Sequence, residues 1–186
     1  MAQPKTIGSK EIHAAIEQLA AAISDRHAAT PRLLLLGIAN GGVELARRLA
    51  TRLAALDPGR SIQAGTVDIS FHRDDIARNP IPKEFASTHI PADVDGASVI
   101  LVDDVLFSGR TVKAALDELF DYGRPTLVEL AILVDRGGRR LPFAANYTGL
   151  TVQPAPAEKV VVRLDPTDPA NDIVRLDPAA NRNSEI

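Results

Sequence analysis

Short runs of consecutive apolar residues, each ending at a turn that leads into a helix, constrain this sequence more than any other feature. Four leucines at 33–36 end at Gly37, and the apolar run 99–102 ends at two acidic residues. Runs without polar alternation are typical of strands buried on both faces of a parallel sheet. The following segments, 43–53 and 111–120, repeat apolar side chains at helical spacing. The pattern predicts an open α/β sheet whose strands alternate with helices.

Further elements extend this pattern in both directions. Residues 12–23 form an amphipathic pattern after Ser9, which we expect to be the N-cap of a first helix. Strands are predicted at 62–71, at 127–134 and, at an edge, at 160–162, and the proline-containing segment 72–97 is predicted to be a long loop. A pentapeptide at 162–166 recurs at 174–178, but two short copies do not indicate a repeat architecture.

Composition narrows the class of protein. The 186 residues, 45% of them hydrophobic, suit one domain, which we expect to span 1–180 with a disordered tail at 181–186. A formal charge of −3 gives no global positive field for nucleic acid or an anionic membrane. The absence of cysteine excludes thiolate catalysis and fits a reducing compartment. With no apolar segment of membrane-spanning length, we expect a soluble, cytoplasmic protein.

The segment 99–111 carries the strongest functional signal. It couples an apolar strand to Asp103 and Asp104 and then to a loop that opens a helix. Carboxylates at a strand end can accept hydrogen bonds from sugar hydroxyls or hold the waters of a magnesium ion. An acidic strand end followed by a serine-capped helix would explain the pieces separately, but not their conjunction.

The loop within this segment has the chemistry of a phosphate site. A helix N-terminus offers unpaired amides and the positive end of the helix dipole, and Gly109 lets the backbone wrap closely around a phosphate. Ser108 and Thr111 add hydroxyl donors. A sugar phosphate would therefore be bound through its diol and its phosphate together.

Two other post-strand turns are candidates, because ligands of open α/β sheets bind beyond the carboxyl ends of the strands. The turn 37–42 matches neither a dinucleotide fingerprint nor a P-loop, and it is either a pyrophosphate loop or an ordinary strand-to-helix turn. The turn 134–140 can present backbone groups to a base, and we interpret its Arg139 and Arg140 as solvated loop charges.

Four segments together resemble the PyrR family: 68–75, 99–111, 122–125 and 133–137. The resemblance covers about 12–172. It implies a type I phosphoribosyltransferase fold, an open, mostly parallel sheet flanked by helices, with a flexible loop and a small hood. The implied activity is that of a uracil phosphoribosyltransferase, which makes uridine monophosphate (UMP) and pyrophosphate from uracil and 5-phosphoribosyl-1-pyrophosphate (PRPP). Many members of the family also attenuate pyrimidine operon mRNA.

The resemblance also implies site residues, partners and a cofactor. Asp103 and Asp104 would bind the ribose hydroxyls and Mg²⁺, the latter through PRPP or water, and Arg73 of the long loop would join them in catalysis. The substrate-binding residues would be Asn40, Gly41 and Gly42 for pyrophosphate, Val105, Phe107, Ser108, Gly109, Arg110 and Thr111 for the ribose phosphate, and Val134, Asp135, Arg136 and Gly137 for the base. The expected partners are PRPP, uracil and UMP, with pyrimidine leader RNA as an open question, no membrane, and a second copy of the chain in a dimer or tetramer.

Two departures from the family pattern matter. The pyrophosphate loop usually reads threonine-arginine-glycine where this chain has Asn40-Gly41-Gly42, so a charged contact is missing, and the loop arginines and lysine (Arg73, Arg78, Lys83) are candidates to replace it. Gly138 stands where attenuating members have a histidine. Two alternatives to the uracil enzyme therefore remain: an RNA-binding attenuator with weak catalysis, and a purine-base phosphoribosyltransferase.

Overall fold

The computed structural model describes residues 6–60, 62–70 and 87–178. Several predictions concern residues outside these ranges, namely the tail 181–186, the end of the strand predicted at 62–71, and the three loop cations Arg73, Arg78 and Lys83. The other predictions can be compared with the structure.

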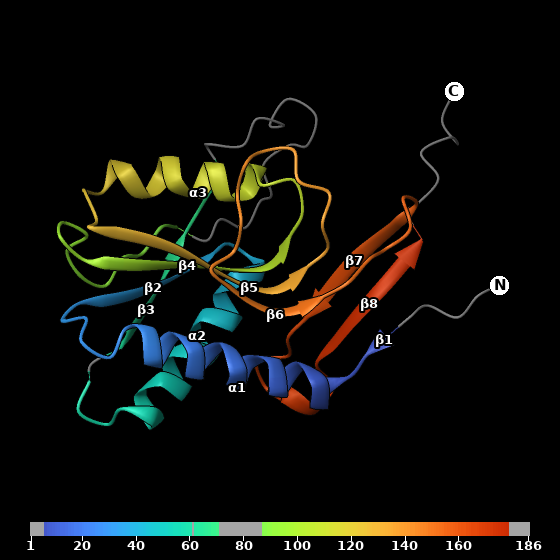
Figure 1. Cartoon of the computed structure of the whole chain (residues 1–186), viewed down its shortest axis with the longest axis horizontal. Helices are drawn as coiled ribbons and strands as arrows, with labels where there is room; N and C mark the ends of the chain where they lie inside the picture. The colour runs from blue at the N-terminus through green and yellow to red at the C-terminus, as the bar shows by residue number, and fades with distance from the viewer. Residues whose placement is uncertain (1–5, 61, 71–86, 179–186) are drawn as a thin grey trace.

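The main sheet has five parallel strands in the order β3-β2-β4-β5-β6 (Figure 1). The strands are β2 (Leu33–Ile38), β3 (Gln63–Val67), β4 (Ser98–Leu106), β5 (Leu127–Asp135) and β6 (Tyr147–Thr151). The helices are α1 (Ser9–Arg26), α2 (Gly41–Leu56) and α3 (Arg110–Asp121). This arrangement confirms the predicted parallel α/β fold.

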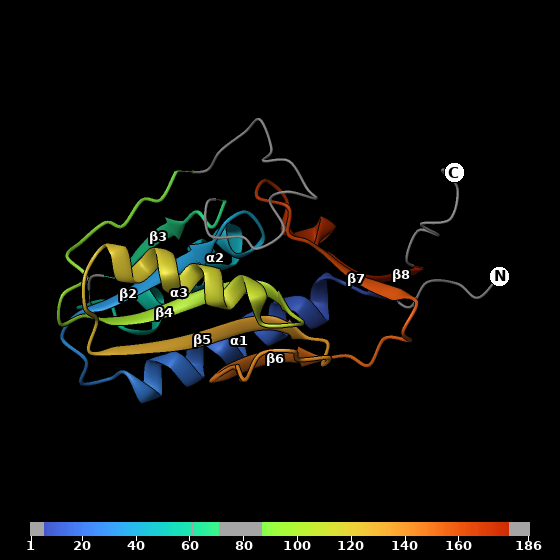
Figure 2. The same cartoon turned by 90° about the horizontal axis from the view of Figure 1, so that it is seen from above.

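Helices cover both faces of the sheet, as Figure 2 shows from above. One buried cluster joins α1 and α2 to side chains such as Leu35, Ile100 and Leu133. A second cluster joins α3 to the intervening side chains, including Leu36 and Leu101. Successive strand residues thus point to opposite covered faces, which is why these strands read as continuous apolar runs.

A second, smaller sheet stands at one end of the molecule. It is antiparallel, in the order β1 (Thr6–Ile7), β8 (Ile173–Pro178) and β7 (Glu158–Arg163), and a short 3₁₀ turn, η1 (Pro169–Asn171), lies between β7 and β8. We call β7, β8 and their connection the hood. The repeated pentapeptide acquires a structural meaning here, because Val162 of the first copy pairs with Val174 of the second. The predicted strand at 160–162 is an edge strand of this sheet.

The structure corrects some local predictions. Helix α1 begins at Ser9 itself, and its N-cap is Gly8, so the Ser9 side chain does not cap it. Strand β3 ends at Val67 because the Asp68 carboxylate accepts hydrogen bonds from the backbone N–H (2.9 Å) and the hydroxyl (2.6 Å) of Ser70, which turns the chain. Strand β6 was not predicted, and its five residues include two threonines and a glycine rather than an apolar run.

The chain passes from β2 to β3 on one side of β2, and it then crosses to β4 on the other side of β2. The direction in which strands are added to the sheet therefore changes between β2 and β4. Ligands of open α/β sheets bind at this switch point, beyond the carboxyl ends of the strands. The turns after β2 and β4 are two of the three that the sequence singled out. In the described part of the chain, no helix is long and apolar enough to cross a membrane.

Candidate active site

The turn between β2 and α2 packs directly against β4. A Cβ atom on Gly42 would lie 2.0 Å from the carbonyl oxygen of Val102, so only glycine permits this approach of the two backbones. The preceding peptide bond, Ala39–Asn40, is cis. Helix α2 then begins at Gly41, beside the end of β4.

Asp103 and Asp104 lie inside β4, three and two positions before its end at Leu106, rather than after the strand. Asp104 extends over the start of α2, where a Cβ on Gly41 would be 2.5 Å from its Cγ. Asp103 is buried, and its Oδ1 accepts a hydrogen bond from the backbone N–H of Asp104 at 3.0 Å.

The two carboxyl groups sit in an environment that disfavours negative charge. Burial raises the pKa of Asp103 well above its ordinary value, and the neighbouring charge of Asp104 raises it further. Burial also raises the pKa of Asp104. Such a pair is suited to a cationic ligand, whose charge would compensate both carboxylates.

The phosphate loop predicted at 107–111 has the expected geometry. Gly109 is the N-cap of α3 with φ of 89°, a left-handed conformation that favours glycine. The Ser108 hydroxyl accepts a long hydrogen bond (3.4 Å) from the backbone N–H of Arg110. Arg110 and Thr111 are the exposed first residues of the helix. The loop therefore presents a helix N-terminus and hydroxyl groups to solvent, as anion sites do.

The turn after β5 lies beside this loop because β4 and β5 are paired through Val105 with Val134 and Leu106 with Asp135. The guanidinium of Arg136 stacks over the ring of Phe107, 4.3 Å from its centroid, and its Nη2 donates to the carbonyl of Glu158 at 3.1 Å. The predicted base-binding and phosphate-binding residues thus belong to the ends of two paired strands and to the turns that follow them.

Arg139 differs from its interpretation as a solvated charge. Its Nη1 donates to the carbonyl oxygens of Leu106 (3.3 Å) and Phe107 (3.1 Å), and its Nη2 pairs with the Asp135 carboxylate. Arg139 therefore connects the turn 134–140, which we call the base turn, to the phosphate loop. Arg140 is exposed, as expected.

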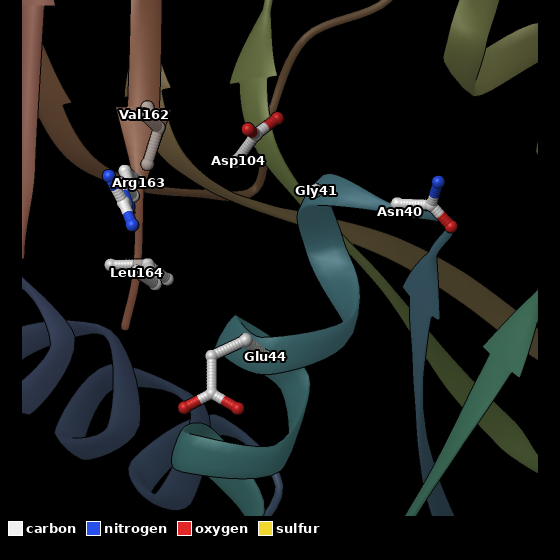
Figure 3. Close-up of a pocket in the computed structure, with 7 residues that line it drawn as sticks. All are labelled: Asn40, Gly41, Glu44, Asp104, Val162, Arg163 and Leu164. Carbon is white, nitrogen blue, oxygen red and sulfur yellow. The ribbon is translucent and has the colours of Figure 1, made fainter. Parts of the chain in front are cut away.

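A cavity of about 260 Å³ lies between the pyrophosphate loop and the hood (Figure 3). It is lined by Asn40, Gly41, Glu44, Asp104, Val162, Arg163 and Leu164. The first two and Asp104 were predicted from sequence. The hood residues and Glu44 were missed, and the recurrence of the pentapeptide was the signal that could have placed 162–164 in a paired strand.

Among the residues that the structure describes, no group of three or more histidine, cysteine or acidic side chains could hold a metal ion alone. Two adjacent carboxylates of raised pKa, beside a helix N-terminus, fit a divalent cation that takes its remaining oxygens from a bound phosphate or water. The donor set is thus compatible with the predicted magnesium.

Comparison with known proteins places this geometry in a family. A phosphoribosyl transferase domain matches residues 8–167. The hypoxanthine phosphoribosyltransferase of Trypanosoma cruzi has a similar fold, with a TM-score of 0.66 at 21% identity over 92% of this chain and 94% of that one. The chain is a phosphoribosyltransferase.

Relatives at higher identity narrow the family. The bifunctional protein PyrR of Chloroflexus aurantiacus is 41% identical over 96% of this chain and 98% of its own length. That of Corynebacterium glutamicum is 51% identical over 78% of this chain and 74% of its own. The chain belongs to the PyrR family.

Proposed function

We propose that this protein transfers the phosphoribosyl group of PRPP to uracil, forming UMP and releasing pyrophosphate. The observation that carries the proposal is the meeting of three features at the switch point of the sheet: a glycine-rich helix start, the Asp103–Asp104 pair at the end of β4, and the phosphate loop 107–111. Each of these features suits a different part of PRPP. Asp104 lies against the helix start at Gly41, and it precedes the phosphate loop by a few residues in the chain.

The protein's own groups account for binding and orientation. The amides at Gly41 and Gly42 would receive the departing pyrophosphate, and the phosphate loop would hold the 5′-phosphate at the start of α3. The Asp103–Asp104 pair would fix the ribose hydroxyls, so that N1 of uracil meets C1 in line with the leaving group. Val134, Asp135, Arg136 and Gly137 would border the base. Magnesium, when bound with PRPP, would supply positive charge to the leaving pyrophosphate.

The choice of uracil rests on the PyrR relatives, since the hypoxanthine enzymes share the fold at about 20% identity only. A panel of uracil, hypoxanthine and guanine, each incubated with PRPP and magnesium, tests it. Uracil should be the preferred acceptor, and a preference for either purine would replace the proposal with the purine-base alternative. In the same assay Asp104→Asn should lose most turnover while staying folded, and equal activity in this variant would contradict the role of Asp104.

RNA binding is the second candidate, favoured by the bifunctional relatives. Four arginines are candidates to contact RNA: Arg26, Arg136, Arg139 and Arg140. The first three have other partners, since Arg26 donates to Glu129, Arg136 to the Glu158 carbonyl, and Arg139 to Asp135 and the Phe107 carbonyl. We therefore rank RNA binding below catalysis. Uridine-nucleotide-dependent, salt-sensitive binding of pyrimidine leader RNA would reverse this order.

The proposal includes a single domain over 1–180, assembly into a dimer or tetramer, and a cytoplasmic location. The first buried cluster, which joins the main sheet to the hood, supports the single domain. The lack of cysteine supports the cytoplasmic location. Arg73 remains part of the proposed catalytic set, although it lies outside the described residues.

A further inference from the structure

The cavity between the pyrophosphate loop and the hood joins two parts of the chain that are more than a hundred residues apart. Asn40 and Gly41 line it from the loop, and Val162 and Arg163 line it from β7. Figure 3 shows β7 facing the start of α2, with Asp104 between them. A ligand group bound at the loop would therefore also meet the hood.

Arg163 is the cation that lines this cavity. The other charged lining residues are Glu44 and Asp104. Glu44 is occupied, since its carboxylate accepts from Arg47 at 2.7 and 2.8 Å and from Arg48 at 2.6 Å. Within the described ranges, the guanidinium of Arg163 makes no hydrogen bond or ion pair, and the residue is exposed. Its charge is thus available to a ligand.

The backbone that carries Arg163 is fixed to α2. Buried Arg48 donates through Nη2 to the carbonyl of Asp165 at 2.6 Å, and it pairs with the buried carboxylate of Asp172. The backbone N–H of Asp165 donates to the same carboxylate at 2.8 Å. Because α2 also begins at Gly41, one helix sets the position of the hood relative to the loop.

The pyrophosphate loop itself has no positive side chain. Residues 40–42 are Asn40, Gly41 and Gly42, so the loop can offer amides but not a charge-assisted hydrogen bond from a guanidinium. We infer that Arg163 binds the pyrophosphate group of PRPP and supplies from the hood the positive charge that the loop lacks. This assignment rests on the proposed phosphoribosyl transfer.

Pyrophosphate is the part of the substrate that this position fits. The 5′-phosphate has its own loop at the start of α3, and uracil is uncharged. A guanidinium can donate two parallel hydrogen bonds to phosphate oxygens, and in a cavity with two carboxylates it would offset their repulsion of an anion. Arg163 is therefore a residue for binding and retaining the leaving group.

Two variants and one matched control test the assignment. Arg163→Gln removes the charge, and Arg163→Lys keeps the charge but removes the fork of donors. Arg175→Gln is the control, because Arg175 lies exposed on the neighbouring strand β8 and pairs with Asp177 at 3.2 Å. Calorimetry would measure the binding of inorganic pyrophosphate with magnesium, of PRPP with magnesium, and of UMP, which has no pyrophosphate group.

Arg163→Gln should weaken pyrophosphate and PRPP about tenfold or more, since hydrogen bonds to charged groups are the strong ones. UMP should bind with unchanged affinity. Arg163→Lys should be intermediate, and Arg175→Gln should match the wild type for all three ligands.

Three results would overturn the assignment: unchanged pyrophosphate affinity in Arg163→Gln, an equal loss of UMP affinity, or a wild-type protein that does not bind pyrophosphate. Since pyrophosphate binding needs no acceptor base, the outcome is independent of the base panel. A wild type that binds pyrophosphate through Arg163 but forms no nucleotide would refute the proposed function alone.

Discussion

The carboxylate of Asp104 occupies the space into which a side chain on Gly41 would project, with 2.5 Å between Asp104 Cγ and the position of a Cβ. The obstacle is the end of a side chain that can rotate. At the next residue the obstacle is backbone, because a Cβ on Gly42 would be 2.0 Å from the Val102 carbonyl oxygen. The two adjacent glycines therefore serve different purposes, and alanine at each position should separate function from stability.

Gly41→Ala should fold with a melting temperature close to that of the wild type, because Asp104 can turn away. Its kcat/KM for PRPP should fall about tenfold, since small misplacements of catalytic groups are costly. Gly42→Ala should instead lose several degrees of melting temperature, because two backbone segments must separate. Thermal unfolding and steady-state kinetics on both variants would check this, and equal melting temperatures would contradict it.

A pair of adjacent arginines on α2 offers a matched test of the attachment of the hood. Arg48 is buried and holds Asp172 and the Asp165 carbonyl, whereas Arg47 is exposed and contacts Glu44. Arg48→Met should cost about 3 kcal/mol of unfolding free energy, because it leaves the Asp172 carboxylate buried with fewer partners. Arg47→Met should stay within about 0.5 kcal/mol of the wild type. Urea denaturation measures both.

Asp172→Asn in the Arg48→Met background identifies the cause of that loss. The double variant should recover part of the stability, because it no longer buries a carboxylate whose remaining partners are His13 and the Asp165 N–H. If the double variant is no more stable than Arg48→Met, the loss comes from packing rather than from charge.

The sequence predicted the parts of the molecule whose signal is local. Strands buried on both faces are visible as apolar runs, and the phosphate loop is defined by neighbouring residues such as Ser108 and Gly109. The resemblance implied a small hood, and its strand at 160–162 was predicted, but β8 was not, because it is recognisable only once Val162 and Val174 pair. Arg47 and Arg48 are adjacent and chemically identical in the sequence. Arg48 is the buried one, and its partner Asp172 lies far along the chain.

The same reason explains the errors within the site. Arg139 was interpreted as a loop charge because its acceptors, the carbonyls of Leu106 and Phe107, lie on another strand end. The cavity residue Arg163 belongs to the repeated pentapeptide, to which the sequence alone gave no function. Spatial partners that are distant in sequence were therefore missed, whereas the turns after β2 and β4 were recognised from their neighbouring residues.

A buried network at the opposite end of β5 gives a prediction for pH. The Glu129 carboxylate accepts from Tyr147 Oη (2.6 Å) and Arg26 Nε (2.6 Å), and it lies 2.8 Å from His27 Nε2. Burial opposes ionisation of Glu129, but the hydrogen bonds from Tyr147, His27 and Arg26 outweigh it and lower the pKa below 4.5. A carboxyl group whose pKa is lowered on folding stabilises the protein above its unfolded pKa and loses that contribution as the pH falls.

Glu129→Gln should accordingly be less stable than the wild type by about 2 kcal/mol at pH 7, since it loses charge-assisted hydrogen bonds. The difference should shrink as the pH falls below about 4.5. Unfolding free energies measured in urea between pH 3 and pH 8 would check this. A difference that grows on acidification would show that Glu129 is not the ionised partner.

Two neighbouring glycines of the base turn test the contact with Phe107. Gly137 (φ 69°) and Gly138 (φ 76°) both have left-handed backbones, so alanine at either should cost about 1 kcal/mol in strain. A Cβ on Gly138 would also meet the Phe107 ring at 2.6 Å, whereas one on Gly137 would have no described atom within 4 Å. Gly138→Ala should therefore lose more stability and more UMP affinity than Gly137→Ala, by urea denaturation and calorimetry. Equal losses would mean that the Phe107 ring moves away from the new Cβ at no measurable cost.

Helix α2 begins at the pyrophosphate loop and, seven residues later, holds the hood through Arg48. At 1.5 Å per residue, about 10 Å of helix separates the two attachments. The length of this part of α2 thus sets the distance between the pyrophosphate loop and the hood, where the leaving group would bind. Inserting or deleting one residue between 41 and 48 would swing Arg48 around the helix by about 100° and detach the hood, so this stretch should tolerate exchanges of side chain but no change of length.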